Sequence, residues 1–107
     1  MSSQLFYYDN AIFYDEHDNI IDQKVTERLA QINIFTWLPR DSNVLELGSN
    51  YGIVSCLINH SLINPKNHIV IESNKLLIDA LKKNKENTNC QFEIVNDCSF
   101  ICNSVET

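Results

Sequence analysis

The stretch Val44-Leu45-Glu46-Leu47-Gly48-Ser49-Asn50-Tyr51-Gly52 contains both glycines of the 107-residue chain. An apolar run over residues 44–47 ends at the first glycine, and apolar residues at helical spacing follow the second, which predicts a strand, a tight turn and a helix. Because glycine has no Cβ, its backbone can turn sharply and lie close to a ligand, and the next helix N-terminus offers N–H groups to an anion. The stretch therefore predicts a small-molecule site. It lacks the middle glycine of the dinucleotide pattern G-x-G-x-x-G, and a turn of this kind also occurs without any ligand.

Strand and helix patterns alternate along the rest of the chain. Strands are predicted at 44–47, 69–71 and 92–95, with helices at 51–60 and 74–85 between them. Because crossovers between parallel strands are almost always right-handed, the expected fold is α/β: a Rossmann-like layer of three parallel strands in the spatial order 3-2-1.

The first 40 residues show a different pattern. Aromatic and apolar runs at 5–8 and 11–14 flank the turn-forming pair Asp9-Asn10, which predicts a short hairpin, and a second turn fits 16–19. A helix is predicted over 23–35, capped by Asp22 and with Val25, Leu29 and Ile32 on its apolar face. We therefore expect one domain over residues 1–107, with an N-terminal hairpin and helix (1–40) before the Rossmann-like unit (41–107).

Acidic and amide side chains follow the second and third predicted strands. Glu72 ends the second strand, about 20 residues after the glycine turn, where a carboxylate can accept hydrogen bonds from both hydroxyls of a ribose. Asn96 and Asp97 end the third strand. Ligands of open α/β sheets bind outside the carboxyl ends of the strands, so these groups are expected at one edge. The alternatives are a surface carboxylate for Glu72 and a turn cap for Asp97.

Here the sequence resembles a known family. Residues 46–52 look like the D/E-x-G-A/S-N-x-G turn of FkbM-type methyltransferases, a branch of the class I S-adenosylmethionine-dependent enzymes. Residues 69–74 are similar to the family's second-strand "x-E-P-x" segment, with Ser73 in place of proline, and 81–84 to its "L-x-x-N" segment. Asp97 fits the broader class I pattern better than the FkbM pattern.

The resemblance implies a cofactor and a set of contacts. S-adenosylmethionine would lie with its methionine part at the glycine turn, its ribose at Glu72 and its adenine near Asp97. The cofactor-binding residues implied are Glu46, Gly48, Ser49, Asn50, Gly52, Glu72, Ser73 and Asp97. The activity implied is methyl transfer, with an oxygen atom as the expected acceptor.

The class I sheet has seven strands, whereas only three are predicted here. We therefore expect a partial class I methyltransferase sheet in a truncated or fragmentary chain that holds the cofactor-binding half. The alternatives are a non-catalytic Rossmann-like binding or structural module derived from such an enzyme, and an unrelated nucleotide-binding or redox protein that uses its cysteines. The first strand would lie at an apolar edge, which we expect to be covered by residues 5–14, by a second copy in a homodimer or by a partner protein.

Composition and the spacing of the cysteines exclude several other classes of function. The formal net charge of −6 argues against nucleic-acid binding, which depends on Lys and Arg at phosphates. No apolar run is long enough to span a bilayer and no signal-peptide pattern is present, so we expect a cytoplasmic protein. The four cysteines form no CxxC pair and are expected to be reduced and partly buried, with no metal site. None of the three histidines, His17, His60 and His68, has a sequence neighbour that predicts a general base.

Overall fold

The computed structural model describes residues 11–22 and 25–97. Their elements are β1 (Phe13–Tyr14), β2 (Ile20–Ile21), α2 (Arg28–Trp37), β3 (Val44–Leu47), α3 (Ile53–Ser61), β4 (His68–Ile71), α4 (Lys75–Asn87) and β5 (Glu93–Val95). From β3 onward, strand and helix alternate as the apolar periodicity predicts. The result is a small α/β fold that is compatible with part of a Rossmann-like fold.

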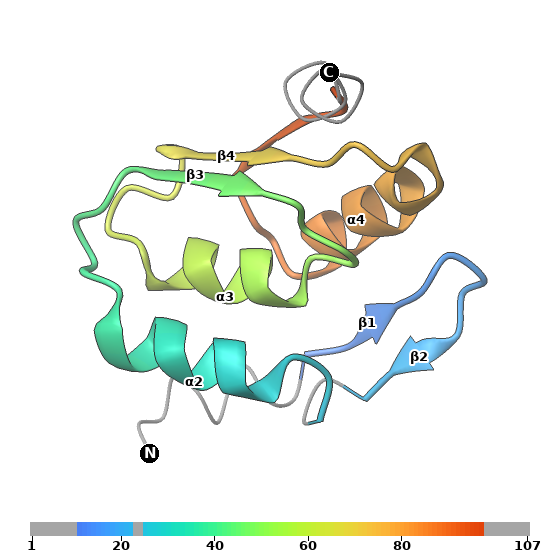
Figure 1. Cartoon of the computed structure of the whole chain (residues 1–107), viewed down its shortest axis with the longest axis horizontal. Helices are drawn as coiled ribbons and strands as arrows, with labels where there is room; N and C mark the ends of the chain where they lie inside the picture. The colour runs from blue at the N-terminus through green and yellow to red at the C-terminus, as the bar shows by residue number, and fades with distance from the viewer. Residues whose placement is uncertain (1–10, 23–24, 98–107) are drawn as a thin grey trace, which may run out of the picture.

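The three-stranded sheet is parallel throughout, in the order β3-β4-β5. This confirms the predicted order, in which the first strand is at one edge and the third at the other. Both crossovers step in the same direction across the sheet, so α3 and α4 lie on the same face (Figure 1). The core lies between this face and the helices, and its fully buried members include Ile53, Leu57, Val70, Leu81 and Phe92.

The opposite face of the sheet carries no helix from the described part of the chain (Figure 1). Side chains alternate along a strand, so residues next to buried ones point to this face. Leu45 and Leu47 of β3 are 63% and 52% exposed, and Ile69 of β4 is 38% exposed. We call Leu45, Leu47 and Ile69 the bare face. Within the described residues, β3 also pairs on one side only.

The described N-terminal hairpin forms at the second predicted turn. β1 pairs with β2 through the turn at 15–19, where Asp15 Oδ1 accepts the N–H groups of His17 at 2.8 Å and Asn19 at 2.9 Å. The second predicted turn therefore makes the observed hairpin, because this aspartate satisfies the turn's own donors. The strand predicted at 5–8 and the Asp9-Asn10 turn lie outside the described residues.

Helix α2 begins later than predicted and buries another face. Asp22 is not its cap: the Asp22 carbonyl accepts the N–H groups of Val25 and Thr26 in a preceding turn, and Glu27 stands at the N-cap. Val25 and Leu29, predicted to be buried, are exposed, whereas Gln31 is fully buried. The Gln31 amide donates to the Thr26 carbonyl at 3.0 Å, and its oxygen accepts from Arg28, so burial leaves it hydrogen-bonded.

Candidate functional site

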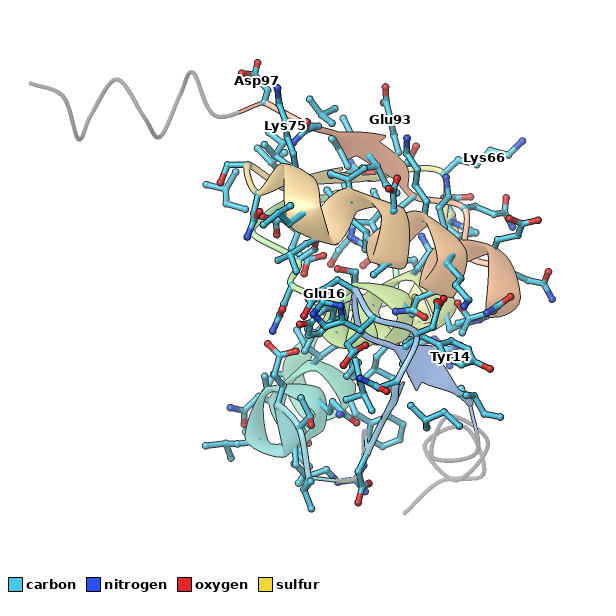
Figure 2. All side chains as sticks on the ribbon, turned by 90° about the vertical axis from the view of Figure 1, so that its right-hand side faces the viewer. Tyr14, Glu16, Lys66, Lys75, Glu93 and Asp97 are labelled. Carbon is cyan, nitrogen blue, oxygen red and sulfur yellow. The ribbon has the colours of Figure 1, made fainter. Side chains whose placement is uncertain are left out.

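The carboxyl ends of the three parallel strands meet at one edge, as predicted. The Gly48 N–H donates to the Ile71 carbonyl at 2.7 Å, which joins the end of β3 to that of β4. The Glu72 N–H donates to Val95 at 2.9 Å, and the Asn96 amide donates back to the Glu72 carbonyl at 2.7 Å. Figure 2 faces this edge, with Lys75 of α4 and Asp97 on the same side of it.

The glycine turn carries its two glycines for different reasons. Gly48 and Gly52 have φ values of +82° and +91°, a region that L side chains rarely adopt. A Cβ added at Gly48 would meet no atom within 4 Å, so the space beside its backbone is open. A Cβ at Gly52 would lie 2.6 Å from Leu81 Cδ1, so this glycine lets the turn pack against α4. Gly48 alone leaves room for a ligand.

The Glu72 carboxylate is folded onto this turn. It is 6% exposed, and its Oε1 atom accepts the N–H groups of Ser49 at 2.9 Å and Asn50 at 3.1 Å and the Ser49 hydroxyl at 3.2 Å. Its Oε2 atom accepts the Asn74 N–H at 2.9 Å. Burial raises the pKa of Glu72, but hydrogen bonds from the N–H groups of Asn74, Ser49 and Asn50 outweigh it, so the pKa is lowered. The carboxylate is therefore ionised at neutral pH and stabilises the conformation of the turn.

Glu46 lies beneath the turn, on the helix-facing side of β3. Its carboxylate accepts the Ser55 hydroxyl at 2.9 Å and lies 3.2 Å from His68 Nε2. The Asn59 amide nitrogen lies 3.2 Å from His68 Nδ1 and donates to the Pro65 carbonyl. Because this amide nitrogen is a donor, His68 Nδ1 accepts a hydrogen bond from Asn59, and His68 Nε2 donates one to Glu46. Glu46 thus ties β3 to α3 and β4.

Three of the four remaining predicted residues lie at the surface of the edge. Ser49 is buried, whereas Asn50, Ser73 and Asp97 are exposed. Asn50 has a φ of +52°, a conformation that asparagine tolerates better than most residues. Asn74, next to Ser73, caps α4 by accepting the Leu76 N–H at 3.0 Å.

Two side chains that were not among the predicted site residues, Asn84 and Tyr51, support the turn from the hairpin side. The Asn84 amide, fully buried, donates to the carbonyls of Tyr51 and Tyr14 at 2.8 Å each, and its oxygen accepts the Tyr14 N–H at 2.9 Å. The Tyr51 hydroxyl donates to Glu16, 2.5 Å away, and this bond raises the pKa of Tyr51 to about 12. A surface hollow lies here, lined by Glu16, His17, Tyr51, Asn74, Leu76 and Leu77. In the sequence, Asn84 stands out only as the last residue of the L-x-x-N segment.

Comparison with known proteins assigns this chain to no family. No protein-family model matches the chain, and no curated protein matches its sequence. Within residues 11–22 and 25–97, no three His, Cys, Asp or Glu side chains are grouped so as to hold a metal ion. No helix in this part of the chain has the length and apolar character needed to cross a membrane. Function has to be inferred from the geometry of the site.

Proposed function

We propose that the glycine turn and Glu72 bind S-adenosylmethionine, and that the chain is the cofactor-binding part of an FkbM-type methyltransferase acting on an oxygen acceptor. The observation that carries the proposal is the open space at Gly48. It lies at the carboxyl edge of a parallel sheet and borders a turn held by an ionised carboxylate. The φ of +82° by itself favours glycine at this position, and the open space beside it is where a ligand would approach the backbone.

The residues present fit this cofactor. The Gly48 backbone leaves room for the methionine part. Glu72 Oε2 accepts a single N–H, from Asn74, so a lone pair is left to which a ribose hydroxyl could donate. By the resemblance, the adenine would lie on the side of Asp97. When bound, S-adenosylmethionine supplies an electrophilic methyl group on a positively charged sulfur.

Methyl transfer to oxygen also requires a proton acceptor and a pocket that aligns the nucleophile. Neither can be assigned among the described residues. Glu46 and His68 are not available as proton acceptors, because they contact each other beneath the sheet. We therefore propose that residues 11–97 contribute cofactor binding, with no methyl transfer by these residues alone.

One observation favours a second candidate, a non-catalytic module derived from a methyltransferase. The Glu72 carboxylate already accepts four hydrogen bonds from within the chain. A purely structural carboxylate would do the same. The two candidates differ in whether a ligand can share or replace these bonds.

Isothermal titration of the full chain with S-adenosylmethionine and S-adenosylhomocysteine separates the candidates. We expect weak binding that Gly48→Ala abolishes, because the new methyl group would project into the open space. Asn89→Ala is the matched control: its φ of +56° imposes similar backbone strain at the far end of α4, and binding should persist. Absence of binding by the folded wild-type chain, or unchanged affinity in Gly48→Ala, would favour the structural module.

A further inference from the structure

Two thiols that are 34 residues apart meet on one hydroxyl group. Cys56 lies in α3, and Cys90 follows α4. The Thr88 Oγ1 atom lies 3.2 Å from Cys56 Sγ and 3.1 Å from Cys90 Sγ, and Cys90 Sγ lies 3.9 Å from the Cys56 carbonyl oxygen. Each thiol also shifts the pKa of the other. The pair joins the first turn of α3, where the Cys56 N–H donates to the Gly52 carbonyl at 2.8 Å, to the segment that follows α4.

The surroundings of the two sulfurs differ. Burial raises the pKa of Cys56, whose side chain is fully enclosed. The hydrogen bond from Cys56 lowers the pKa of Cys90, and His60 and Thr88 lower it further. His60 is held beside the pair by its ring Nε2, which donates to the Thr88 carbonyl at 2.7 Å. These directions favour Cys90 as the thiolate and Cys56 as the thiol.

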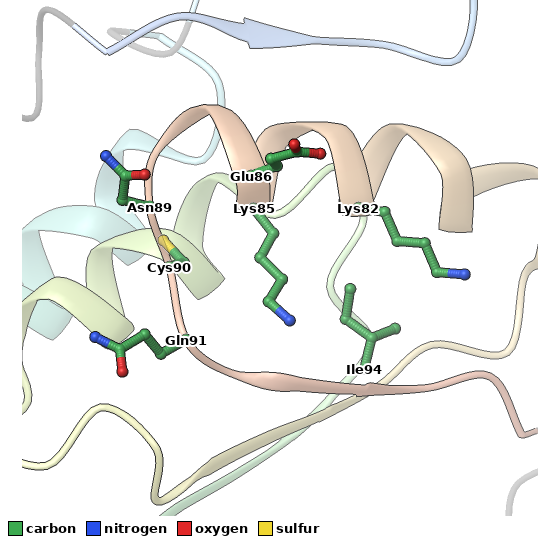
Figure 3. A pocket seen from close by; sticks show the side chains of 7 residues that line it. All are labelled: Lys82, Lys85, Glu86, Asn89, Cys90, Gln91 and Ile94. Carbon is green, nitrogen blue, oxygen red and sulfur yellow. The ribbon is translucent and has the colours of Figure 1, made fainter.

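Only Cys90 of the pair has access to a surface pocket. That pocket is lined by Lys82, Lys85, Glu86, Asn89, Cys90, Gln91 and Ile94. Figure 3 shows the Lys85 side chain extending from α4 across the pocket, between Cys90 and Ile94. The lining contains two lysines and one glutamate, a local positive excess in a chain whose net charge is −6. A small molecule that carries carboxylates suits this lining better than a cationic one.

We propose that Cys90 and Cys56 form a redox-active dithiol that exchanges with a small, anionic disulfide held in the pocket beside Cys90. Cys90 is the attacking sulfur and Cys56 the resolving one. The site is separate from the glycine turn and does not depend on the function proposed for it.

The exchange takes two steps. The Cys90 thiolate attacks one sulfur of the small disulfide, so that a mixed disulfide forms and the other half leaves as a thiolate. The Cys56 thiol then gives its proton to that thiolate and attacks the Cys90 sulfur. The Cys56–Cys90 bond forms and the second half leaves. Two electrons pass from the dithiol to the small disulfide, whose halves depart as one thiol and one thiolate.

The test uses the full chain with Cys98→Ser and Cys102→Ser, two positions outside the described residues. Incubation with oxidised glutathione at pH 7 should remove two hydrogen atoms from the protein mass. A non-reducing digest should then contain a peptide pair linked through Cys56 and Cys90. In this background Cys56→Ser should accumulate a glutathione adduct on Cys90, whereas Cys90→Ser should leave Cys56 unmodified.

Two outcomes in the protein that keeps both Cys56 and Cys90 would overturn the proposal of a redox-active dithiol. One is a stable glutathione adduct on Cys90, and the other is no reaction until urea is added. Because both outcomes are measured with Cys56 and Cys90 in place, they test the proposal even if the Cys56→Ser or Cys90→Ser variant fails to fold. The charge of the partner is tested with cystamine, a cationic disulfide. The rate of each disulfide with the protein is divided by its rate with free cysteine. This ratio should be higher for oxidised glutathione than for cystamine. The double substitution Lys82→Gln, Lys85→Gln should make the two ratios equal. Equal ratios in the unsubstituted protein would overturn the anionic partner.

Discussion

The backbone N–H of Ser49 donates to the Oε1 atom of Glu72 at 2.9 Å, which closes the glycine turn onto the end of the neighbouring strand. This bond joins the two sequence features on which the proposed cofactor site depends. It also makes the geometry of the turn depend on the ionisation of one side chain.

Replacing Glu72 should therefore reduce stability in a pH-dependent way. Glu72→Gln keeps the size but loses the charge, and we expect the free energy of unfolding at pH 7 to fall by about 1–3 kcal/mol. The lowered pKa of Glu72 means that its contribution is complete above its ordinary value of 4.5 and is lost as the pH falls through the folded-state value. Urea unfolding of both proteins at pH 7 and pH 3 measures this. A difference as large at pH 3 as at pH 7 would contradict it.

The two glycines should respond differently to alanine. Both substitutions strain a positive φ, at a cost of about 1 kcal/mol. Gly52→Ala also forces a methyl group against Leu81, and overpacking adds about 1–3 kcal/mol. Gly48→Ala is the control, since nothing lies within 4 Å of its new methyl group. Equal losses of unfolding free energy would show that Leu81 moves aside without cost.

Asn84→Ala should loosen the hairpin as well as destabilise the chain. It removes three hydrogen bonds at a fully buried position, and we expect a loss of about 2–4 kcal/mol. Asn87→Ala, at an exposed position of the same helix, should change stability by less than about 0.5 kcal/mol. Amide exchange at Tyr14, whose N–H bonds to Asn84, should accelerate only in the first variant. Unchanged exchange there would mean that the hairpin is held by other contacts.

Cys90 should react as a low-pKa thiol. Its pKa is lowered to about 5 by the hydrogen bond from Cys56, with His60 and Thr88 adding to it, so its alkylation rate should reach a plateau below pH 7. His60→Gln keeps a donor for the Thr88 carbonyl but removes the imidazole, and the profile should move to higher pH. Iodoacetamide labelling in the Cys98→Ser, Cys102→Ser background measures this. A rate that rises through pH 8.5 in the unsubstituted pair would show an ordinary thiol.

The bare face should cause self-association. Exposed apolar side chains beside an unpaired strand edge favour contact with another chain, whether a second copy or a partner protein. Sedimentation should depend on concentration, and Leu45→Lys with Leu47→Lys should shift the protein towards monomer. Leu29→Lys, at a residue of α2 that is more exposed than either, is the control. A monodisperse monomer with rapid amide exchange along β3 would contradict this prediction.

The parallel sheet could be predicted from sequence because its signals are local. Apolar runs such as residues 44–47 and the glycines at the turn place strands and helices close to where they form, and crossover handedness then fixes the strand order. The face of α2 could not be predicted. Burial of Gln31 depends on a carbonyl at Thr26 and on the packing of α2 against α3, and neither appears in the periodicity that favoured Leu29.

The site could be predicted only in part, for a similar reason. The position of Glu72 at a strand end follows from the strand pattern, but the bonds from Ser49 and Asn50 that occupy its Oε1 atom depend on the exact shape of the turn. The meeting of Cys56, Cys90 and His60 joins two successive turns of α3 to the α4–β5 connection. Topology places α3 beside α4, but the contact between Cys56 and Cys90 depends on how the two helices pack, which the sequence pattern does not show.

The Asn84 amide also has a consequence for the order of folding. It joins Tyr14 to α4 across 70 residues of chain, whereas the β3-α3-β4-α4-β5 unit is built from much shorter connections. Closing a long loop costs entropy before its contacts form, and the partner of Tyr14 exists only once α4 has formed. The hairpin should therefore dock in the last stage of folding, and on partial unfolding it should be the first described element to separate.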